Sequence, residues 1–212
     1  MAYLIKELFL TLQGEGVHAG RVAVFCRFAG CNLWSGREED RANATCRFCD
    51  TDFRGTGGRG GGRFESAEML ANRLLHTWGE SARGGRPYVV FTGGEPMLQL
   101  NADLVDACHT LGLEVAVETN GTLPLAPGID WTCVSPKAGS ELVVVRGDEL
   151  KLVFPQPGAM PSKFEHLDFR HYSLQPMDGV NWRQNARAAV DYCHANPKWR
   201  LSVQTHKMLE IP

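Results

Sequence analysis

Residues 22–31 have the sequence VAVFCRFAGC, from Val22 to Cys31. β-Branched and aromatic residues dominate the first seven positions and a glycine follows, so this stretch predicts a strand that ends in a loop. Similar strand patterns occur later, at residues 88–92, 113–118, 131–135, 149–154, 171–175 and 200–205. The strand that leads to Cys31 is therefore predicted to be one of a series.

Three segments between these strands have helical periodicity instead. Apolar residues line one face of residues 67–75, with Ser66 as a suitable N-cap. A second helix is predicted over residues 101–111, where Gly112 follows at the usual glycine position, and a third after Asn181. Alternating strands and helices predict right-handed β-α-β units and a parallel sheet. Three helices are too few for a complete eight-fold barrel of about 250 residues, so we expect an α/β fold with a reduced barrel or an open sheet.

Composition excludes several classes of protein. The chain has 212 residues, with 22 Lys and Arg against 24 Asp and Glu, and a formal net charge of −2. This length favours one domain over residues 1–212, and the balanced charge predicts no nucleic-acid partner. The apolar runs are too short to span a membrane, and Lys6 and Glu7 interrupt the N-terminal one, which does not resemble a signal peptide. Seven cysteines are an odd number for a disulfide framework, so we expect reduced thiols and a cytoplasmic location.

Three cysteines form the strongest chemical signal. Cys46 and Cys49 make a C-x-x-C pair, and fourteen residues separate Cys46 from Cys31. Thiolates three positions apart can bind one metal centre from a single turn of chain. Buried packing thiols, a zinc site completed by a histidine and a redox-active pair are alternatives, but the stretch is polar, lacks a second ligand pair and opens no helix. An iron–sulfur cluster with one iron open to a non-protein ligand explains the pattern best.

The remaining candidates are weaker. Four other cysteines fall on predicted strands or helix faces and are expected in the core: Cys26, Cys108, Cys133 and Cys193. Cys26 stays an alternative ligand, because it precedes Cys31 by only five positions. Residues 55–62 are rich in glycine but lack the Gly-Lys-Ser/Thr ending of a phosphate loop, so we expect a mobile surface loop. The histidines have no ligand spacing, and only His206 is expected to face the site.

The cysteine trio, Phe48 beside its last member, and the block Thr92 to Pro96 after a strand together resemble the radical S-adenosylmethionine superfamily. Further blocks resemble its 7-carboxy-7-deazaguanine synthase family: Leu12 to Gly16, Arg27 to Asn32, Cys49 to Thr51, Glu118 to Gly121, Ser135 to Lys137 and Gln204 to Lys207. One departure from the superfamily is the gap of fourteen residues between the first two cysteines, where three are usual. The resemblance implies a partial β/α barrel with about six parallel core strands, a cluster-binding loop insertion at residues 32–45 and a C-terminal tail that closes the active site.

The resemblance also implies an activity. Members of this family convert 6-carboxy-5,6,7,8-tetrahydropterin to 7-carboxy-7-deazaguanine and release ammonia, on the route to queuosine and other 7-deazapurines. They use a [4Fe–4S] cluster, S-adenosylmethionine and Mg²⁺, and they need a reducing electron donor such as flavodoxin or ferredoxin. A homodimer is expected. Two alternatives are a radical activase that takes hydrogen from a glycine of a partner protein, and a zinc-bound interaction module that would explain the thiolates alone.

Site residues follow from matching these blocks. Cluster and metal ligands are Cys31, Cys46 and Cys49, with Thr51 for Mg²⁺. Residues expected at S-adenosylmethionine are Phe48, Cys49, Asp50, Gly93, Gly94, Glu95, Ser135, Pro136, Lys137, Ser173, Leu174, Gln175 and Pro176. Residues expected at the substrate are Leu12, Gln13, Gly14, Glu15, Arg27, Thr92 and Pro212. Glycines let the backbone approach a ligand closely, and an arginine fork suits the substrate carboxylate.

Overall fold

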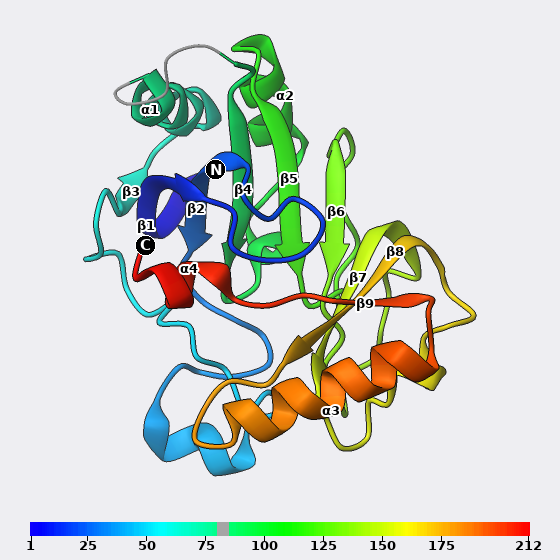
Figure 1. Cartoon of the computed structure of the whole chain (residues 1–212). Helices are drawn as coiled ribbons and strands as arrows, with labels where there is room; N and C mark the ends of the chain where they lie inside the picture. The colour runs from blue at the N-terminus through cyan, green and yellow to red at the C-terminus, as the bar shows by residue number, and fades with distance from the viewer. Residues whose placement is uncertain (80–84) are drawn as a thin grey trace.

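The computed structural model describes residues 1–79 and 85–212. Within them, nine strands form one curved sheet in the order β3-β1-β2-β4-β5-β6-β7-β8-β9 (Figure 1). The strands are β1 (Tyr3–Leu12), β2 (Val22–Phe28), β3 (Gly62–Phe64), β4 (Tyr88–Gly93), β5 (Glu114–Thr119), β6 (Trp131–Val134), β7 (Arg146–Phe154), β8 (Asp168–Pro176) and β9 (Trp199–Leu201). The helices are α1 (Ala67–Gly79), α2 (Ala102–Thr110), α3 (Trp182–Ala195) and α4 (Thr205–Leu209).

Seven neighbouring strands of the sheet run parallel and form the body of a partial barrel: β2, β4, β5, β6, β7, β8 and β9. Helix α1 connects β2 to β4 by way of the short β3, α2 connects β4 to β5, and α3 connects β8 to β9. The connections from β5 to β6 and from β6 to β7 contain no helix among the described residues. The predicted α/β reduced barrel is confirmed, and each predicted strand overlaps a strand of the sheet.

No strand was predicted over β1, which pairs antiparallel with both β2 and β3. The register of β1 against β2 shifts between Ile5 and Glu7, and this irregularity interrupts the alternation that identifies a strand. The glycine-rich residues 55–62 were expected to form a surface loop, and in the structure they pack against β1. Gly58 N donates to Lys6 O at 3.0 Å, and a Cβ on Gly61 would lie 2.2 Å from the same oxygen.

Local capping explains where the predicted helices begin and end. Ser66 Oγ accepts from Met69 N at 3.3 Å at the start of α1, as expected of an N-cap. Asn101 caps α2 by accepting from Leu104 N at 3.2 Å. Gly112 follows α2 with a φ of +77°, a conformation that a glycine adopts at little cost.

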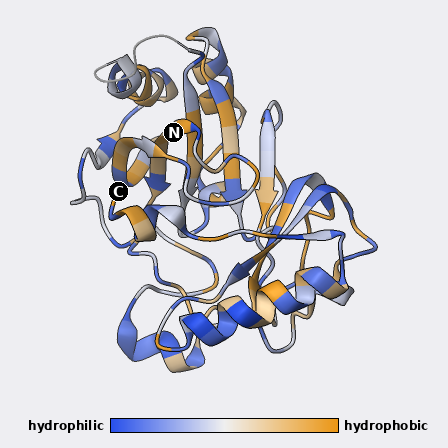
Figure 2. Ribbon diagram, in the orientation of Figure 1, coloured by the Kyte–Doolittle hydropathy of each residue, from blue (hydrophilic) through white to orange (hydrophobic). Residues whose placement is uncertain are grey.

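Two apolar clusters hold the sheet to its helices. The larger joins α1 and α2 to β1, β2, β4 and β5, and it contains Cys26 and Cys108. The smaller joins α3 to β6, β7 and β8, with only Ala189 of α3 fully buried. Figure 2 shows α3 as a mostly hydrophilic ribbon with short hydrophobic patches, consistent with a helix that packs on one side only. Cys193 is half-buried beside the smaller cluster. None of the described helices has the length and apolar character that crossing a membrane requires.

The last predicted strand is shorter than expected. Residues 200–205 were predicted as a strand, but β9 ends at Leu201 and α4 begins at Thr205. Ser202 N still donates to Leu174 O at 2.8 Å, after which the chain leaves the sheet. Thr205 N donates to Gly14 O at 2.9 Å, so contact with the segment after β1 replaces sheet pairing.

Candidate active site

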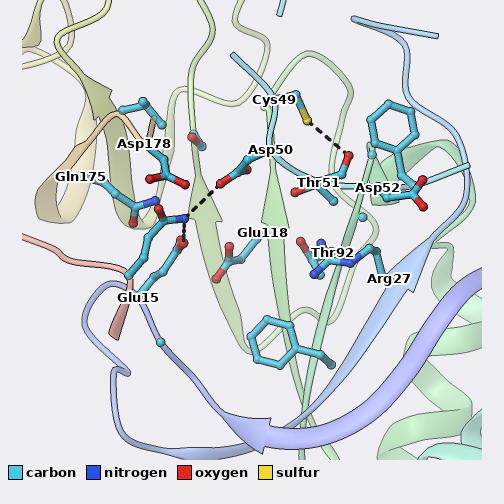
Figure 3. A pocket seen from close by; sticks show the side chains of 18 of the residues that line it. Glu15, Arg27, Cys49, Asp50, Thr51, Asp52, Thr92, Glu118, Gln175 and Asp178 are labelled. Carbon is cyan, nitrogen blue, oxygen red and sulfur yellow. Dashed lines mark hydrogen bonds between the residues drawn. The ribbon is translucent and has the colours of Figure 1, made fainter. Parts of the chain in front are cut away.

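A cavity of about 440 Å³ opens where the parallel strands end. Its wall includes Cys31 beyond β2, Gly93 at the end of β4, Thr119 at the end of β5, Ser135 beyond β6 and Pro176 at the end of β8. Ligands of parallel sheets bind at this edge, because loops after neighbouring strands converge there. Figure 3 shows the acidic, basic and thiol side chains that line the cavity from different segments.

All three predicted cluster cysteines line this cavity. Leu33 N donates to Cys31 Sγ at 3.4 Å. The Cys46 thiol donates to Cys49, which together with burial raises the pKa of Cys46, while the same hydrogen bond lowers the pKa of Cys49 to about 6. Within the described residues, no three His, Cys, Asp or Glu side chains are grouped tightly enough for a single ion. A cluster binds each thiolate through a different iron, so three soft thiolates spread around one cavity fit it.

Lys137 lies beside these thiols. Its Nζ donates to Ser135 O and Ser135 Oγ, at 2.6 Å each. Burial lowers the pKa of Lys137, and the thiol groups of Cys46 and Cys49 act in the opposite direction. The segment after β6 therefore provides a partly buried lysine next to the cysteine trio.

The glycine pair after β4 is required by the packing of the chain itself. Gly93 has a φ of +130°, and a Cβ at that position would lie 2.4 Å from Phe28 O. A Cβ on Gly94 would lie 2.1 Å from Gly30 O and 2.8 Å from Cys31 Cβ. Glycines thus let the end of β4 cross the end of β2 directly beside the first cysteine, and both also line the cavity.

Four residues expected to contact S-adenosylmethionine lie outside the cavity lining: Glu95, Pro136, Ser173 and Leu174. Glu95 is fully buried, and its carboxylate accepts hydrogen bonds from Thr119 Oγ1, Asn120 N and Met97 N at 2.7–2.9 Å. Ser173 Oγ donates to Glu149 at 2.6 Å, and Leu174 is buried in the smaller apolar cluster. The side chains of Glu95, Ser173 and Leu174 thus make contacts inside the protein behind the cavity wall, and a role of these four residues at S-adenosylmethionine stays a prediction.

The opposite side of the cavity carries a buried lysine between two carboxylates. Lys151 Nζ donates to Glu15 Oε2 at 2.6 Å and to Glu118 Oε2 at 3.0 Å. Gln13 Nε2 donates to the other oxygen of Glu118 at 2.9 Å, and Gln204 Nε2 donates to Glu15 Oε1 at 2.9 Å. Burial acts to raise the pKa of Glu15, but Lys151 and the hydrogen bonds lower it to about 2. Glu15 is therefore a carboxylate at neutral pH.

Arg27 and Thr92 are neighbours on β2 and β4, where they are paired in register. Arg27 Nε donates to Glu7 Oε1 at 2.7 Å, and the Arg27 side chain, which lines the cavity, is one-fifth exposed. Glu7 is the only described side chain that pairs with this arginine. Figure 3 shows Arg27 and Thr92 together on the side of the pocket away from Glu15.

The C-terminal segment borders the same cavity. Thr11 Oγ1 donates to an oxygen of Pro212 at 2.7 Å, which holds the end of the chain beside β1. Lys207 of α4 has its Nζ 2.5 Å from both Asp50 and Asp178, so α4 is tied to the cysteine loop and to the segment after β8. His206 lines the cavity, as expected.

Thr51 lines the cavity between two aspartates that are already paired with lysines. Asp50 pairs with Lys207, and Asp52 pairs with Lys6 at 2.6 Å. The Thr51 carbonyl accepts from the Cys49 thiol at 3.8 Å. Its hydroxyl is one oxygen of this segment that could bind a hard ion.

Comparison with known proteins identifies the family. Residues 40–147 match the model of the radical SAM superfamily, a range that includes Cys46 and Cys49 but begins after Cys31. Over the full length of both chains, 61% of residues are identical to 7-carboxy-7-deazaguanine synthase from Bradyrhizobium diazoefficiens and 61% to the enzyme of that name from Bordetella pertussis. The chain belongs to the 7-carboxy-7-deazaguanine synthase family. The crystal structure of QueE from Escherichia coli superposes with a TM-score of 0.71 at 27% identity, covering 96% of this chain and 94% of that one.

Membership of the 7-carboxy-7-deazaguanine synthase family confirms the resemblance, the enzyme class and the partial barrel inferred from the sequence. It decides against the radical activase and the zinc-bound interaction module. The cofactors of this family are a [4Fe–4S] cluster, S-adenosylmethionine and Mg²⁺. Three thiolates in one cavity, with a glycine cradle beside Cys31, fit the cluster.

The remaining predicted residues all line the cavity: Leu12, Gln13, Gly14, Glu15, Arg27, Phe48, Asp50, Thr51, Thr92, Gly93, Gly94, Ser135, Lys137, Gln175, Pro176 and Pro212. Their roles in binding stay predictions. Sequence reasoning missed Lys151, which stands between Leu150 and Leu152 on β7. A lysine inside an apolar strand was the available signal, because burying a charge is costly unless it is paired. Glu118 and Gln204 lie in quoted blocks, but no role was predicted for either.

Proposed function

We propose that this chain is a radical S-adenosylmethionine lyase that converts 6-carboxy-5,6,7,8-tetrahydropterin to 7-carboxy-7-deazaguanine and ammonia. One observation carries the proposal: a single cavity has three cysteine thiols together with Arg27 and the buried group Glu15, Lys151 and Glu118. The thiols provide a site for a redox cluster. The charged groups provide recognition for a small, polar, anionic substrate, and the cavity volume is in the range of small-molecule sites.

Substrate recognition follows from the charges in the cavity. Arg27 donates only its Nε to Glu7, so its other nitrogens can bind the substrate carboxylate. Glu15, ionised at neutral pH, can accept hydrogen bonds from the amino group and ring N–H of the pterin. Gln13 and Lys151 fix the orientation of the Glu118 carboxylate at the same end. Leu12, Gly14, Thr92 and Pro212 complete this part of the site.

Cofactor recognition rests on the other side of the cavity. Cys31, Cys46 and Cys49 would hold a [4Fe–4S] cluster, and Thr51 would give its hydroxyl to Mg²⁺. Reductive cleavage of S-adenosylmethionine at such a cluster is the radical source of this superfamily. The chain orients the bound groups with the backbone of Gly93 and Gly94. Residues that border the same space on this side are Phe48, Asp50, Ser135, Lys137, Gln175 and Pro176.

The proposal includes the organisation of the chain. Residues 1–212 would form a single domain, with residues 32–45 as the cluster-binding insertion and the C-terminal tail closing the cavity against water. The bonds from Thr205 to Gly14 and from Thr11 to Pro212 support such a closure. All seven cysteines lie in the described residues and are free thiols, which supports a cytoplasmic location. A flavodoxin or ferredoxin would supply electrons, and the active form would be a homodimer, both by family resemblance.

Anaerobic reconstitution tests this function. We expect iron and sulfide to be incorporated in equal amounts and, with reductant, S-adenosylmethionine and Mg²⁺, the tetrahydropterin to be converted to a deazaguanine detected by mass spectrometry. Stoichiometric zinc without sulfide would contradict the cluster assignment. A loaded cluster that leaves the pterin unchanged would contradict the substrate assignment.

A further inference from the structure

Hydrogen bonds to the Leu33 carbonyl bring together the two ends of the long segment between the first two cysteines. Its carbonyl accepts from Thr45 N at 3.1 Å and from Cys46 N at 3.4 Å, so residues 34–44 form a loop that leaves the chain and returns at one point. When this loop is set aside, only Asn32, Leu33 and Thr45 stand between Cys31 and Cys46. The fourteen intervening residues therefore become three, and residues 34–44 form a distinct unit that we call the insert.

Trp34 fixes the base of the insert. Its ring is 8% exposed and meets Phe53 edge-on, with ring centroids 5.6 Å apart and an interplanar angle of 88°. The indole Nε1 donates to Arg37 O at 3.0 Å. Phe53 is itself buried, and its carbonyl accepts from Gly30 N at 3.1 Å. The insert is thus anchored to the segment that leads into the first cysteine.

Arg41 connects the insert to the other two cysteines. Its guanidinium lies 4.0 Å above the Trp34 ring, and Nε donates to both oxygens of Glu38 at 2.8 Å. NH1 donates to Arg47 O at 2.9 Å and to Cys49 O at 3.0 Å. Although it lies on a surface loop, this side chain is only 27% exposed. One side chain therefore binds two carbonyls within the C-x-x-C segment while it stacks on the base of the insert.

We propose that Arg41 is a positioning residue for the cluster thiols. It holds the segment from Cys46 to Cys49 in the conformation that presents both thiols to the cavity before a cluster is bound, and it keeps a positive charge beside the Cys49 carbonyl afterwards. This inference rests on the proposed cluster site. One planar guanidinium here donates from Nε to Glu38 and from NH1 to both carbonyls while it stacks on Trp34, and a lysine at this position would keep the charge without this combination of contacts.

Two variants, Arg41→Gln and Arg41→Lys, test the clamp against Arg37→Gln as a matched control. Arg37 lies in the same insert, is 61% exposed, and pairs with Glu39 at 3.6 Å. The first readout uses the cluster-free chain and a protease that cleaves after glutamate, because Glu38 and Glu39 lie exposed in the insert. We expect both Arg41 variants to be cleaved there at least about tenfold faster than wild type, and the control within about twofold.

The second readout uses the reconstituted protein. We expect an iron chelator to remove the cluster from either Arg41 variant about tenfold faster, equivalent to about 1.4 kcal/mol. The reduction potential should become more negative in Arg41→Gln, because a nearby positive charge favours the more negative, reduced cluster. It should change less in Arg41→Lys. Iron and sulfide content of wild type reports separately on the cluster assignment itself.

The outcomes separate the two claims. If wild type assembles a stable cluster while both Arg41 variants match the control in proteolysis and cluster loss, the clamp is refuted and the proposed function stands. If wild type incorporates no sulfide, the proposed function fails instead. Should Arg41→Gln not fold, Trp34→Leu removes the stacking face and leaves Arg41 in place, and the same faster cleavage and cluster loss are expected. If Trp34→Leu is cleaved and loses its cluster at the rates of wild type, the clamp is likewise refuted.

Discussion

Replacing Lys151 with methionine removes the cation that pairs with two carboxylates at the substrate end of the cavity, at nearly constant side-chain volume. Glu15 has a pKa of about 2 in the folded chain against 4.5 for the isolated group. At about 1.4 kcal/mol per unit, this difference corresponds to about 3 kcal/mol. Breaking a buried ion pair by removing one partner costs about 3–5 kcal/mol in other proteins. We therefore expect Lys151→Met to lower the free energy of unfolding by about 3–5 kcal/mol at pH 8.

The pH dependence of the contribution that Glu15 makes to the free energy of unfolding should also change sign. In wild type the folded-state pKa of Glu15 lies below its unfolded value, so its contribution is present above about pH 4.5 and is lost as the pH falls toward 2. Without Lys151, burial dominates and raises the folded-state pKa above the unfolded value. The contribution of Glu15 to stability is then lost as the pH rises. The free energy of unfolding that Lys151→Met loses relative to wild type should therefore be smaller at pH 5 than at pH 8.

Urea unfolding of the cluster-free chains, followed by fluorescence of the five tryptophans, measures both effects. Lys163→Met is the matched control, because Lys163 is exposed and its Nζ donates to Gly158 O at 2.8 Å, with no carboxylate partner among the described residues. We expect this control to differ from wild type by less than about 0.5 kcal/mol. The reasoning is refuted if Lys151→Met loses the same free energy at pH 5 and pH 8, or less than about 1 kcal/mol at pH 8.

Three further predictions concern binding. Cys46→Ala should abolish cluster assembly, whereas Cys108→Ala should assemble the cluster normally and lose about 1–3 kcal/mol of stability in unfolding experiments. A full cluster in Cys46→Ala would exclude Cys46 as a ligand. Arg27→Lys should raise the substrate KM about tenfold because the guanidinium fork is lost. Binding of S-adenosylmethionine, measured by calorimetry, should be unchanged. An equal loss of affinity for substrate and S-adenosylmethionine would instead give Arg27 a structural role. Thr51→Val should reduce the initial rate to that of Mg²⁺-free wild type, and an unchanged Mg²⁺ stimulation would exclude Thr51 as a ligand.

Strand and helix patterns predicted the parallel part of the sheet because its strands are rich in buried β-branched and aromatic residues. The pattern failed in β1, where the register shift falls next to the charged residues Lys6 and Glu7, and at α4, whose five residues carry no clear periodicity. The glycines of residues 55–62 indicated a flexible loop, but glycine is also required where two backbones approach closely, as at Gly61. Composition alone does not separate those two causes.

The candidate site was predicted best where the residue type itself carries the chemistry, as for Cys46, Cys49 and Arg27. It was predicted less well where a role depends on partners distant in sequence. Glu95 directly follows the glycine pair, yet its carboxylate accepts hydrogen bonds from Thr119 Oγ1 and Asn120 N, at and just beyond the end of β5. Lys151 becomes interpretable only when Glu15 is seen beside it, 136 positions earlier in the chain.

The closure at Leu33 also bears on how such enzymes can diverge. Because both ends of the insert meet at one carbonyl, its length can change without moving the two ends, provided that Trp34 and Arg41 keep their contacts with Phe53 and with the Cys46–Cys49 segment. The number of residues between Cys31 and Cys46 can therefore differ in related chains that keep this closure. A search pattern with a fixed spacing would overlook chains of this kind, and one that asks for a returning backbone hydrogen bond just before the second cysteine would find them.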